Sequence, residues 1–248
     1  MSPSIPNRIL NHFLYFVSMA MAGWVLETIY RSIKARRFVN AGFLSGPWVP
    51  LYGFACLAIA IVWNALATRF PIIAWPAVLI LPTILEYLTA MIMERFFGMI
   101  LWDYHDRRFN IKGRICLRFS AYWALLVVAL ILFIQPLLFH RIAVLGIPMG
   151  HFFAGFLLAA LLIDTRHSIR EVFNFKAVLQ ELRELTEQGK PLLPSLYRHH
   201  KGIKLPFDIV RLFKPLTAFP VLLKELRPQL KVFPDWLRER IEKRFGRD

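Results

Sequence analysis

The sequence predicts an all-α, polytopic membrane protein with about five transmembrane helices and a helical cytoplasmic C-terminal tail. Hydrophobic residues make up 57% of the 248 residues, and the mean hydropathy is +0.49. Soluble domains are usually about 45–50% apolar. Several apolar runs also reach the roughly 20 residues that cross a bilayer core about 30 Å thick. The five runs cover residues 9–30, 49–67, 71–93, 119–139 and 144–163.

The net charge of +15 is unevenly spread, and its distribution predicts an orientation. Four Lys or Arg lie in residues 31–48 and six in 94–118, against one each near positions 69 and 141. Because cytoplasmic loops are enriched in Lys and Arg, we expect these two loops and the basic tail inside the cell. The N-terminus is then outside. In a chain of this class a basic excess indicates contact with anionic membrane lipid, and we expect no nucleic-acid partner.

The first apolar run ends in the motif G-W-x-x-E, from Gly23 to Glu27. Glu27 lies about one helical turn from the polar end of its span. It could form a helix-end ion pair with Arg31, four residues later. It could instead face the interior of the helix bundle. Ionisable residues within membrane spans are costly and usually functional, so Glu27 is a candidate site residue.

The loop at 31–53 is rich in Gly and Pro, which predicts a shaped connection. It leads into the second run, so the free amide groups at that helix N-terminus should face it. Such amides bind anions. The residues of this candidate loop or anion site are Arg36, Arg37, Asn40, Ser45 and Gly46. Alternatively, the loop is a tight connector whose glycines only permit the turn.

The third run contains Pro76 and Pro82, which each remove a backbone hydrogen bond and tend to kink a helix. Glu86 follows Pro82 by four residues and has no basic residue within one turn. We therefore expect Glu86 to face a polar pocket. Glu94 lies about 12 Å further along the axis. It either lines the same pocket or pairs with an arginine at the surface.

A long polar loop, residues 94–118, follows this helix. Its W-D-Y motif at 102–104 places a carboxylate between two aromatic residues that carry polar groups. Together with the glutamates it predicts a polar site or substrate path at the cytoplasmic leaflet. The predicted members are Glu27, Glu86, Glu94, Asp103, Tyr104, Asn110 and Arg114.

Five ordered motifs then support a family resemblance. They are G-W-x-x-E at 23–27, N-x-G-F-L-x-G-P-x-x-P-x-Y-G at 40–53, E-x-x-T-x-x-x-x-E at 86–94, W-D-Y at 102–104 and N-x-x-G-R-I-C-L at 110–117. With these motifs, over about residues 10–140, the chain resembles the bacterial family described as putative ABC-transporter type IV, a permease-like group. It departs at Ala90, where the family favours Gly, and at His105, where Ser is more usual.

The resemblance implies transport across the bacterial cytoplasmic (inner) membrane with a separate ATPase subunit. Two functions from different classes stay open. The first is a permease-like integral membrane subunit, in which a homo-oligomer would give the path more room than five spans provide. The second is a membrane-embedded enzyme or lipid-handling protein that acts on a lipid or an anionic head group, with carboxylates as acid or base.

No catalytic residue can be assigned, and we expect no cofactor and no metal. The two cysteines, Cys56 and Cys116, lack the spacing of a metal or redox motif. A P-loop glycine motif is also absent from the sequence, so ATP binding by a P-loop is not expected of this chain.

We divide the chain into a transmembrane domain, residues 1–165, and a basic helical cytoplasmic tail, residues 166–248. A capping-box pattern at Ser168 and Glu171 predicts that a new helix begins there. The segment 235–245 has the pattern of a basic amphipathic helix. Such a helix would lie on anionic lipid or dock on a partner.

Overall fold

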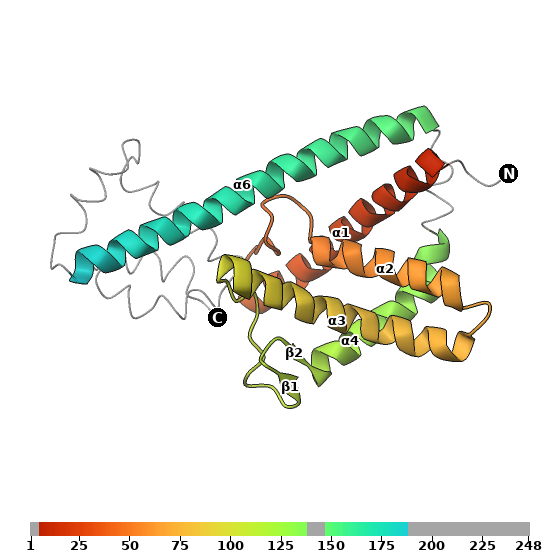
Figure 1. Ribbon diagram of the computed structural model, residues 1–248, viewed down its shortest axis with the longest axis horizontal. Helices are drawn as coiled ribbons and strands as arrows, with labels where there is room; N and C mark the ends of the chain where they lie inside the picture. The colour runs from red at the N-terminus through yellow and green to blue at the C-terminus, as the bar shows by residue number, and fades with distance from the viewer. Residues whose placement is uncertain (1–4, 138–146, 188–248) are drawn as a thin grey trace. The chain divides into compact units, whose positions relative to one another are not determined.

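The computed structural model describes residues 5–137 and 147–187, and these residues are mainly helical (Figure 1). The elements in chain order are α1 (Ile5–Ala35), α2 (Pro50–Leu66), α3 (Pro71–Phe97), β1 (Asn110–Ile111), β2 (Ile115–Cys116), α4 (Leu117–Ala129), the π-helical turn η1 (Leu130–Ile134) and α6 (Ile147–Glu187). The helical class is therefore confirmed. The predicted amphipathic segment at 235–245 lies outside the described residues.

The described helices differ in whether they are long enough to span a bilayer. Within residues 5–137 and 147–187, four helices are long and apolar enough to span a bilayer: Asn7–Ala35, Pro71–Phe97, Leu117–Leu137 and Met149–Asn174. Helix α2 lies where the second span is predicted but has only 17 residues. At a rise of about 1.5 Å per residue it is about 25 Å long. The chain is a membrane protein with several spans, and the count of five stays a prediction.

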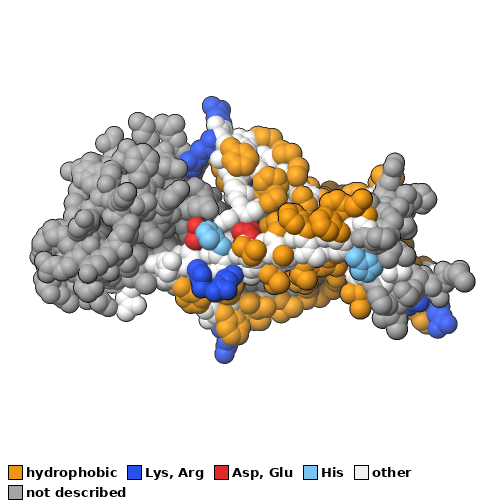
Figure 2. All heavy atoms as spheres, turned by 90° about the horizontal axis from the view of Figure 1, so that it is seen from above, with side chains coloured by type: hydrophobic (Ala, Val, Ile, Leu, Met, Phe, Trp, Pro, Cys, Tyr) orange, Lys and Arg blue, Asp and Glu red, His pale blue; other side chains and the backbone are white. Residues whose placement is uncertain are grey.

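Large apolar side chains cover the outer faces of these helices. Ile72 in α3 is 87% exposed and Phe133 in η1 is 72% exposed. Only 6% of the apolar window in the last span is buried within the chain. Figure 2 shows hydrophobic side chains covering much of the described surface on one face. Apolar surface of this extent marks a site of contact with a partner or a membrane, and helices of spanning length favour lipid.

The chain divides into two compact units, residues 1–27 with 46–164 and residues 28–45 with 165–248. In the first unit, α2 and α3 lie side by side and antiparallel, joined by a short turn (Figure 1). The core of this unit forms where α1 to α4 and η1 meet. Its buried members include Leu10, Tyr15, Ile59, Val78, Val127 and Leu130. The predicted domain boundary at 165/166 stays a prediction.

Helix α3 carries Pro76 and Pro82 in its interior. Pro82 is fully buried, and Glu86 lies one turn later on the same face of the helix. The helix ends at Gly98, whose left-handed φ of 53° reverses the chain. This reversal carries the following loop back along the end of α3, so the loop can reach Glu86.

The loop after α3 contains a short β-hairpin that the sequence analysis does not predict. Strands β1 and β2 pair antiparallel, with Asn110 opposite Cys116. The turn residues Lys112 and Gly113 both have positive φ, 53° and 65°, as a tight hairpin turn requires. Two-residue strands are too short for an alternating apolar pattern to reveal them.

Helix α6 corrects the predicted start of the tail helix. Ser168 and Glu171 lie inside α6, which begins at Ile147, so they do not cap a new helix. Ser168 is instead buried, with 1% of its surface exposed. Its Oγ accepts a hydrogen bond of 3.2 Å from the Ser45 amide, within the second unit. The apolar pattern of the last span continues past Asp164 at helical spacing, and a local capping pattern does not interrupt it.

Candidate functional site

Two pairs, each a carboxylate with a tyrosine, form the centre of the site in the first unit, and their members are half-buried except for Glu86, which is buried. The Tyr52 hydroxyl in α2 donates to Glu27 Oε2 in α1 at 3.1 Å. The Tyr104 hydroxyl in the loop after α3 donates to Glu86 Oε1 at 3.2 Å. The two carboxyl groups interact electrostatically. We call Glu27, Tyr52, Glu86 and Tyr104 the carboxylate–tyrosine cluster.

Helix α4 supplies an aromatic wall to this cluster. The Trp123 ring lies 4.8 Å from the Tyr52 ring, centroid to centroid, and its indole also faces the Glu86 carboxyl group. One turn earlier, the Phe119 ring stacks on Tyr104 at 4.7 Å with an interplanar angle of 20°. Both tyrosine rings are thereby held in place while their hydroxyl groups reach the carboxylates.

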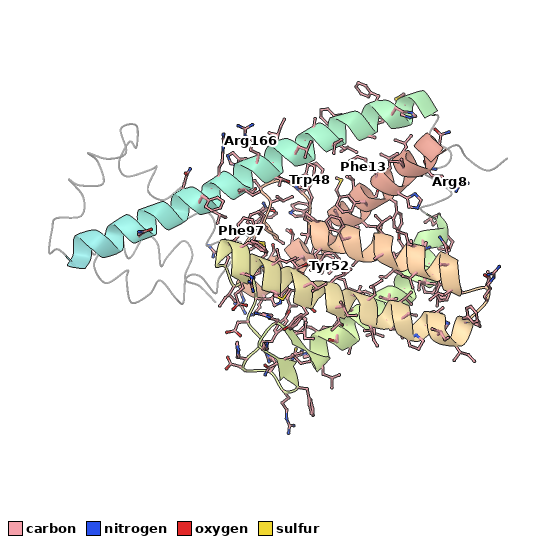
Figure 3. The ribbon with its side chains drawn as sticks, viewed as in Figure 1. Arg8, Phe13, Trp48, Tyr52, Phe97 and Arg166 are labelled. Atoms are coloured by element: carbon pink, nitrogen blue, oxygen red, sulfur yellow. The ribbon has the colours of Figure 1, made fainter. Side chains whose placement is uncertain are left out.

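The G-W-x-x-E motif explains how Tyr52 reaches Glu27. A side chain at Gly23 would overlap the Tyr52 ring, so the absence of a Cβ there lets the ring lie against α1. Glu27 follows Gly23 by four residues and therefore lies on the same face of the helix. Figure 3 labels Tyr52 at the start of α2. The motif thus supplies the space in which the Tyr52 ring lies, at Gly23, and the acceptor for its hydroxyl group, Glu27.

Glu86 is the most deeply buried acid of the cluster, with 4% of its surface exposed. Its Oε2 atom has no hydrogen-bond partner among the described residues. A buried acceptor without a donor costs roughly 1–3 kcal/mol, and more when it is charged. This atom is therefore the position at which a bound donor would gain most.

Tyr104 is set up as a permanent donor to Glu86. Burial raises the pKa of the Tyr104 hydroxyl well above its ordinary value, and the neighbouring Glu86 charge raises it further. The phenol is therefore protonated at neutral pH, and its proton points to the carboxylate. The loop holds this geometry through the Tyr104 amide, which donates to the Gly113 carbonyl at 2.8 Å.

An apolar groove leads up to the cluster between α1, α2 and the α4–η1 helix. The groove is open on one side, and its lining is almost entirely apolar. Tyr52 and Trp123 line the end nearest the two carboxylates. Ala22, Cys56, Ile59, Leu126, Leu130 and Ile134 are among its other lining residues. It has few polar groups along its length.

The predicted site residues Glu94 and Arg114 bond to each other and belong to neither carboxylate–tyrosine pair. Arg114 donates to Glu94 Oε2 from Nη2 at 2.7 Å and from Nε at 3.0 Å. It also donates from Nη1 to the Tyr87 hydroxyl at 3.0 Å. The hydrogen bonds to Glu94 raise the pKa of the guanidinium. We call Tyr87, Glu94 and Arg114 the Arg114 clamp, because it ties the hairpin to α3.

Asp103 and Asn110 shape the loop that presents Tyr104. Asp103 accepts the His105 amide at 2.9 Å and contacts the His105 ring. The Asn110 side-chain amide donates to the Arg107 carbonyl at 2.8 Å, and its oxygen accepts the Gly113 amide. Asp103 is 42% exposed. In this structure both side chains bond to their own loop and not to Glu86.

The loop before α2 contains the residues that the sequence predicts to bind an anion. In the second unit, the Asn40 side chain donates to the Ser45 carbonyl at 2.8 Å. Arg36 ends α1 with a positive φ of 51° and is exposed, and Arg37 is half-buried. These contacts support a shaped loop. A bound anion there stays a prediction.

In the first unit, Asp164 of α6 accepts the two donors that follow that loop. The Gly46 amide donates to Asp164 Oδ2 at 2.9 Å, and the Trp48 indole at 2.8 Å. Figure 3 labels Trp48 in the segment before α2. The predicted anion-binding amide of Gly46 therefore bonds to a carboxylate of the chain itself.

Sequence reasoning missed several partners of the predicted acids, namely Tyr52, Tyr87, Trp123 and Asp164. Tyr52 could have been noticed, because it belongs to the 40–53 motif and lies at the start of the second run. The others carry no local signal, since they meet their partners only through packing. Among the residues described, no cluster of three His, Cys, Asp or Glu is placed to hold a metal ion.

Comparison with known proteins agrees with the motifs. The family described as putative ABC-transporter type IV matches residues 14–169. No curated protein and no solved structure matches the chain. The matched range includes the whole carboxylate–tyrosine cluster, the Arg114 clamp and Asp164. The chain therefore belongs to the putative ABC-transporter type IV family.

Proposed function

We propose that this protein is a permease-like integral membrane subunit of a bacterial transport system. Family membership and the apolar helices support a role connected with membrane transport. The carboxylate–tyrosine cluster would form the polar part of the path, at the cytoplasmic leaflet. The observation that supports this most directly is Glu86, a buried acid in a spanning helix whose Oε2 lacks a donor among the described residues.

The proposed topology has five spans, with α2 as the second, in the bacterial inner membrane. The N-terminus is then outside and the C-terminus is cytoplasmic. The excess of Lys and Arg in residues 31–48, 94–118 and the tail supports this orientation. In unit 1 both tyrosine pairs lie at the same end of the helices as the 98–116 loop. This end would be the inner leaflet.

The proposed topology also indicates which partners the protein would contact. A separate ATPase subunit would dock on the cytoplasmic loops, and anionic lipid would contact the basic tail. A homo-oligomer would supply additional walls for the path. The exposed apolar faces of the helices offer surface for either lipid or a second copy of the chain.

An alternative function is a membrane-embedded enzyme or lipid-handling protein of the inner leaflet. The open apolar groove favours it, because its lining includes Tyr52, whose hydroxyl donates to Glu27. A lipid chain would fit the groove while its head group meets the carboxylates, one of which could act as a general acid or base.

Isolation of the tagged full-length chain from its own membranes tests these alternatives. After mild cross-linking, we expect an ATPase subunit to co-purify, and the complex to lose substrate-dependent ATP hydrolysis in Glu86→Gln. The control is Asp106→Asn, which removes a carboxylate charge at an exposed loop position. Purification without any ATPase, combined with turnover of a labelled lipid in the absence of ATP, would establish the enzyme instead.

A further inference from the structure

The β-hairpin after α3 carries exposed side chains of two kinds. Phe109 and Ile111 are apolar and are 76% and 55% exposed. Of the two acids in the loop, Asp103 contacts the His105 ring and Asp106 is exposed. Three cations are also exposed and form no ion pair among the described residues: Arg107, Arg108 and Lys112. The hairpin therefore presents aromatic and aliphatic groups together with an excess of positive charge.

The backbone of Phe109 adopts a conformation that is rare for a bulky residue. Its φ of 55° lies in the left-handed region, which a Cβ disfavours. The ring gains little burial in exchange, since most of its surface is exposed. Backbone conformations of this kind are concentrated in functional segments. They favour a contact of the Phe109 ring with something outside the chain.

The hairpin lies directly beside the start of a spanning helix (Figure 1). Ile111 pairs with Ile115, which precedes the span Leu117–Leu137 by two residues. At about 3.3 Å per strand residue, both isoleucines lie about 7 Å from the start of that span. The interfacial layer on each side of the hydrocarbon core is roughly 5–8 Å thick. Ile111 is therefore within reach of the membrane surface.

Several contacts hold the hairpin at this position. The Arg114 clamp joins it to Glu94, near the end of α3. The Trp102 indole donates to the Arg114 carbonyl at 2.7 Å, and the Tyr104 amide donates to the Gly113 carbonyl at 2.8 Å. The exposed side chains are thus carried by a segment that is attached to the ends of two spanning helices, α3 and α4.

The chemistry of this surface favours anionic lipid. Aromatic rings and aliphatic groups enter the interfacial layer, and Lys and Arg contact anionic head groups. The exposed apolar surface also continues onto the adjoining helix ends, where Phe96 is 71% and Leu117 60% exposed. A site for a water-soluble protein would not need to be continuous with the lipid-facing surface of the spans.

We infer that the hairpin docks on the anionic surface of the membrane in which α3 and α4 are embedded. Phe109 and Ile111 enter the interfacial layer, and the three exposed cations of the hairpin contact lipid phosphates. Docking also holds the loop that presents Tyr104 to Glu86. Neither a substrate nor an ATPase enters this inference, which goes beyond the proposed function. Only the identity of the leaflet rests on the proposed topology.

The test places a bimane fluorophore on Ile111→Cys in the full-length chain, with Cys56 and Cys116 replaced by serine. The purified protein is reconstituted into nanodiscs of phosphatidylcholine alone, or of equal parts phosphatidylcholine and phosphatidylglycerol. A nitroxide near the top of the lipid chains quenches a docked probe, and acrylamide quenches a probe in water. In the mixed lipid we expect strong quenching by the nitroxide and weak quenching by acrylamide.

Two variants separate the contributions of charge and apolar contact. Arg108→Gln should lower the ratio of docked to undocked probe about fivefold in the mixed lipid, and much less in phosphatidylcholine. Its control is Arg69→Gln, at an exposed position between α2 and α3. Phe109→Ser should lower the ratio about tenfold in both lipids. Phe38→Ser, which removes a ring that is 73% exposed, should leave the probe at position 111 unchanged.

A second measurement uses the chain with its own cysteines and no probe. Trypsin should cleave after Arg107 or Arg108 several times more slowly in the mixed nanodiscs than in phosphatidylcholine. Cleavage after Arg69 in the same sample corrects for any effect of lipid on the protease.

Two results would overturn the inference. A probe that acrylamide quenches strongly in both lipids, together with equal cleavage in both, would leave the hairpin surface to a soluble protein partner. Docking that is equal in both lipids and unchanged in Arg108→Gln would exclude the recognition of anionic head groups. Absence of an ATPase partner would overturn the proposed transport role without affecting either measurement.

Discussion

Gly23 and Tyr52 show how one missing side chain positions a polar group. The Tyr52 ring occupies the space where a Cβ at Gly23 would lie, and its hydroxyl thereby reaches Glu27. We expect Gly23→Ala to displace the ring and destabilise the protein by about 1–3 kcal/mol. Thermal unfolding in detergent measures this. Gly155→Ala is the matched control, because no atom lies near its added Cβ. Equal stability of the two variants would contradict the role of Gly23.

Tyr104 is the residue whose hydroxyl group the fold protects from ionisation. Because burial and the Glu86 charge raise the pKa of Tyr104, the phenol stays protonated through about pH 11, where ordinary tyrosines ionise. We therefore expect Tyr104→Phe to leave the tyrosinate absorbance at about pH 11 unchanged. A loss of absorbance equal to one tyrosine would show that Tyr104 ionises normally. Stability contributed by the protonated phenol is present below about pH 10 and falls above it.

The same variant has a consequence at neutral pH. Tyr104→Phe removes the donor to Glu86 Oε1 and leaves a buried carboxylate with less compensation. We expect a loss of about 1–3 kcal/mol in the free energy of unfolding. Tyr122→Phe is the control. The Tyr122 hydroxyl accepts from Arg118 at the surface, where substitutions usually change stability by less than about 0.5 kcal/mol.

At the scale of elements, the loop and hairpin after α3 act as one unit that delivers Tyr104. Gly98 reverses the chain, the Trp102 indole donates to the Arg114 carbonyl at 2.7 Å, and the Arg114 clamp attaches the hairpin to α3. The W-D-Y motif therefore has three separate structural tasks. Its tryptophan holds the hairpin, its aspartate shapes the turn, and its tyrosine enters the cluster.

Arg114→Lys tests the clamp. A lysine cannot reproduce the forked contacts to Glu94 and Tyr87, so the hairpin should detach more often. We expect trypsin to cleave after Arg107 or Arg108 several times faster than in the wild type. Because Glu94 is about half exposed, global stability should change by less than about 1 kcal/mol. Arg118→Lys, at an exposed position in α4, should not alter cleavage. Identical cleavage rates for wild type and Arg114→Lys would exclude the clamp.

At the scale of the whole molecule, the uneven distribution of Lys and Arg predicts which loops lie inside the cell. Labelling of single cysteines tests this orientation. A single cysteine is placed in a chain whose Cys56 and Cys116 are replaced by serine. With Arg108→Cys, a membrane-impermeant maleimide added to intact cells should give no labelling. With Thr68→Cys, in the turn between α2 and α3, it should label the protein. The reverse pattern would contradict the orientation, and labelling of both positions would contradict the passage of α3 through the membrane.

Much of the organisation was accessible from the sequence, and for physical reasons. Apolar runs of spanning length, interior prolines and acids within apolar runs are properties of single segments, so the helices and the positions of Glu27 and Glu86 within them could be predicted. The hairpin and the continuity of α6 past Ser168 could not be. Two-residue strands carry no periodic pattern, and a capping sequence has no effect where the helix already continues on both sides.

By itself, the sequence determined the helical membrane class, the positions of the acids and the family. Only the tertiary structure decided how the acids are used. It paired Glu27 with Tyr52 and Glu86 with Tyr104, and it assigned Glu94 to the Arg114 clamp and Asp164 to the Trp48 segment. The physical reason is that a side chain's partner depends on the rotation and depth of each helix against its neighbours. Packing of the whole core sets these, and local periodicity does not specify them.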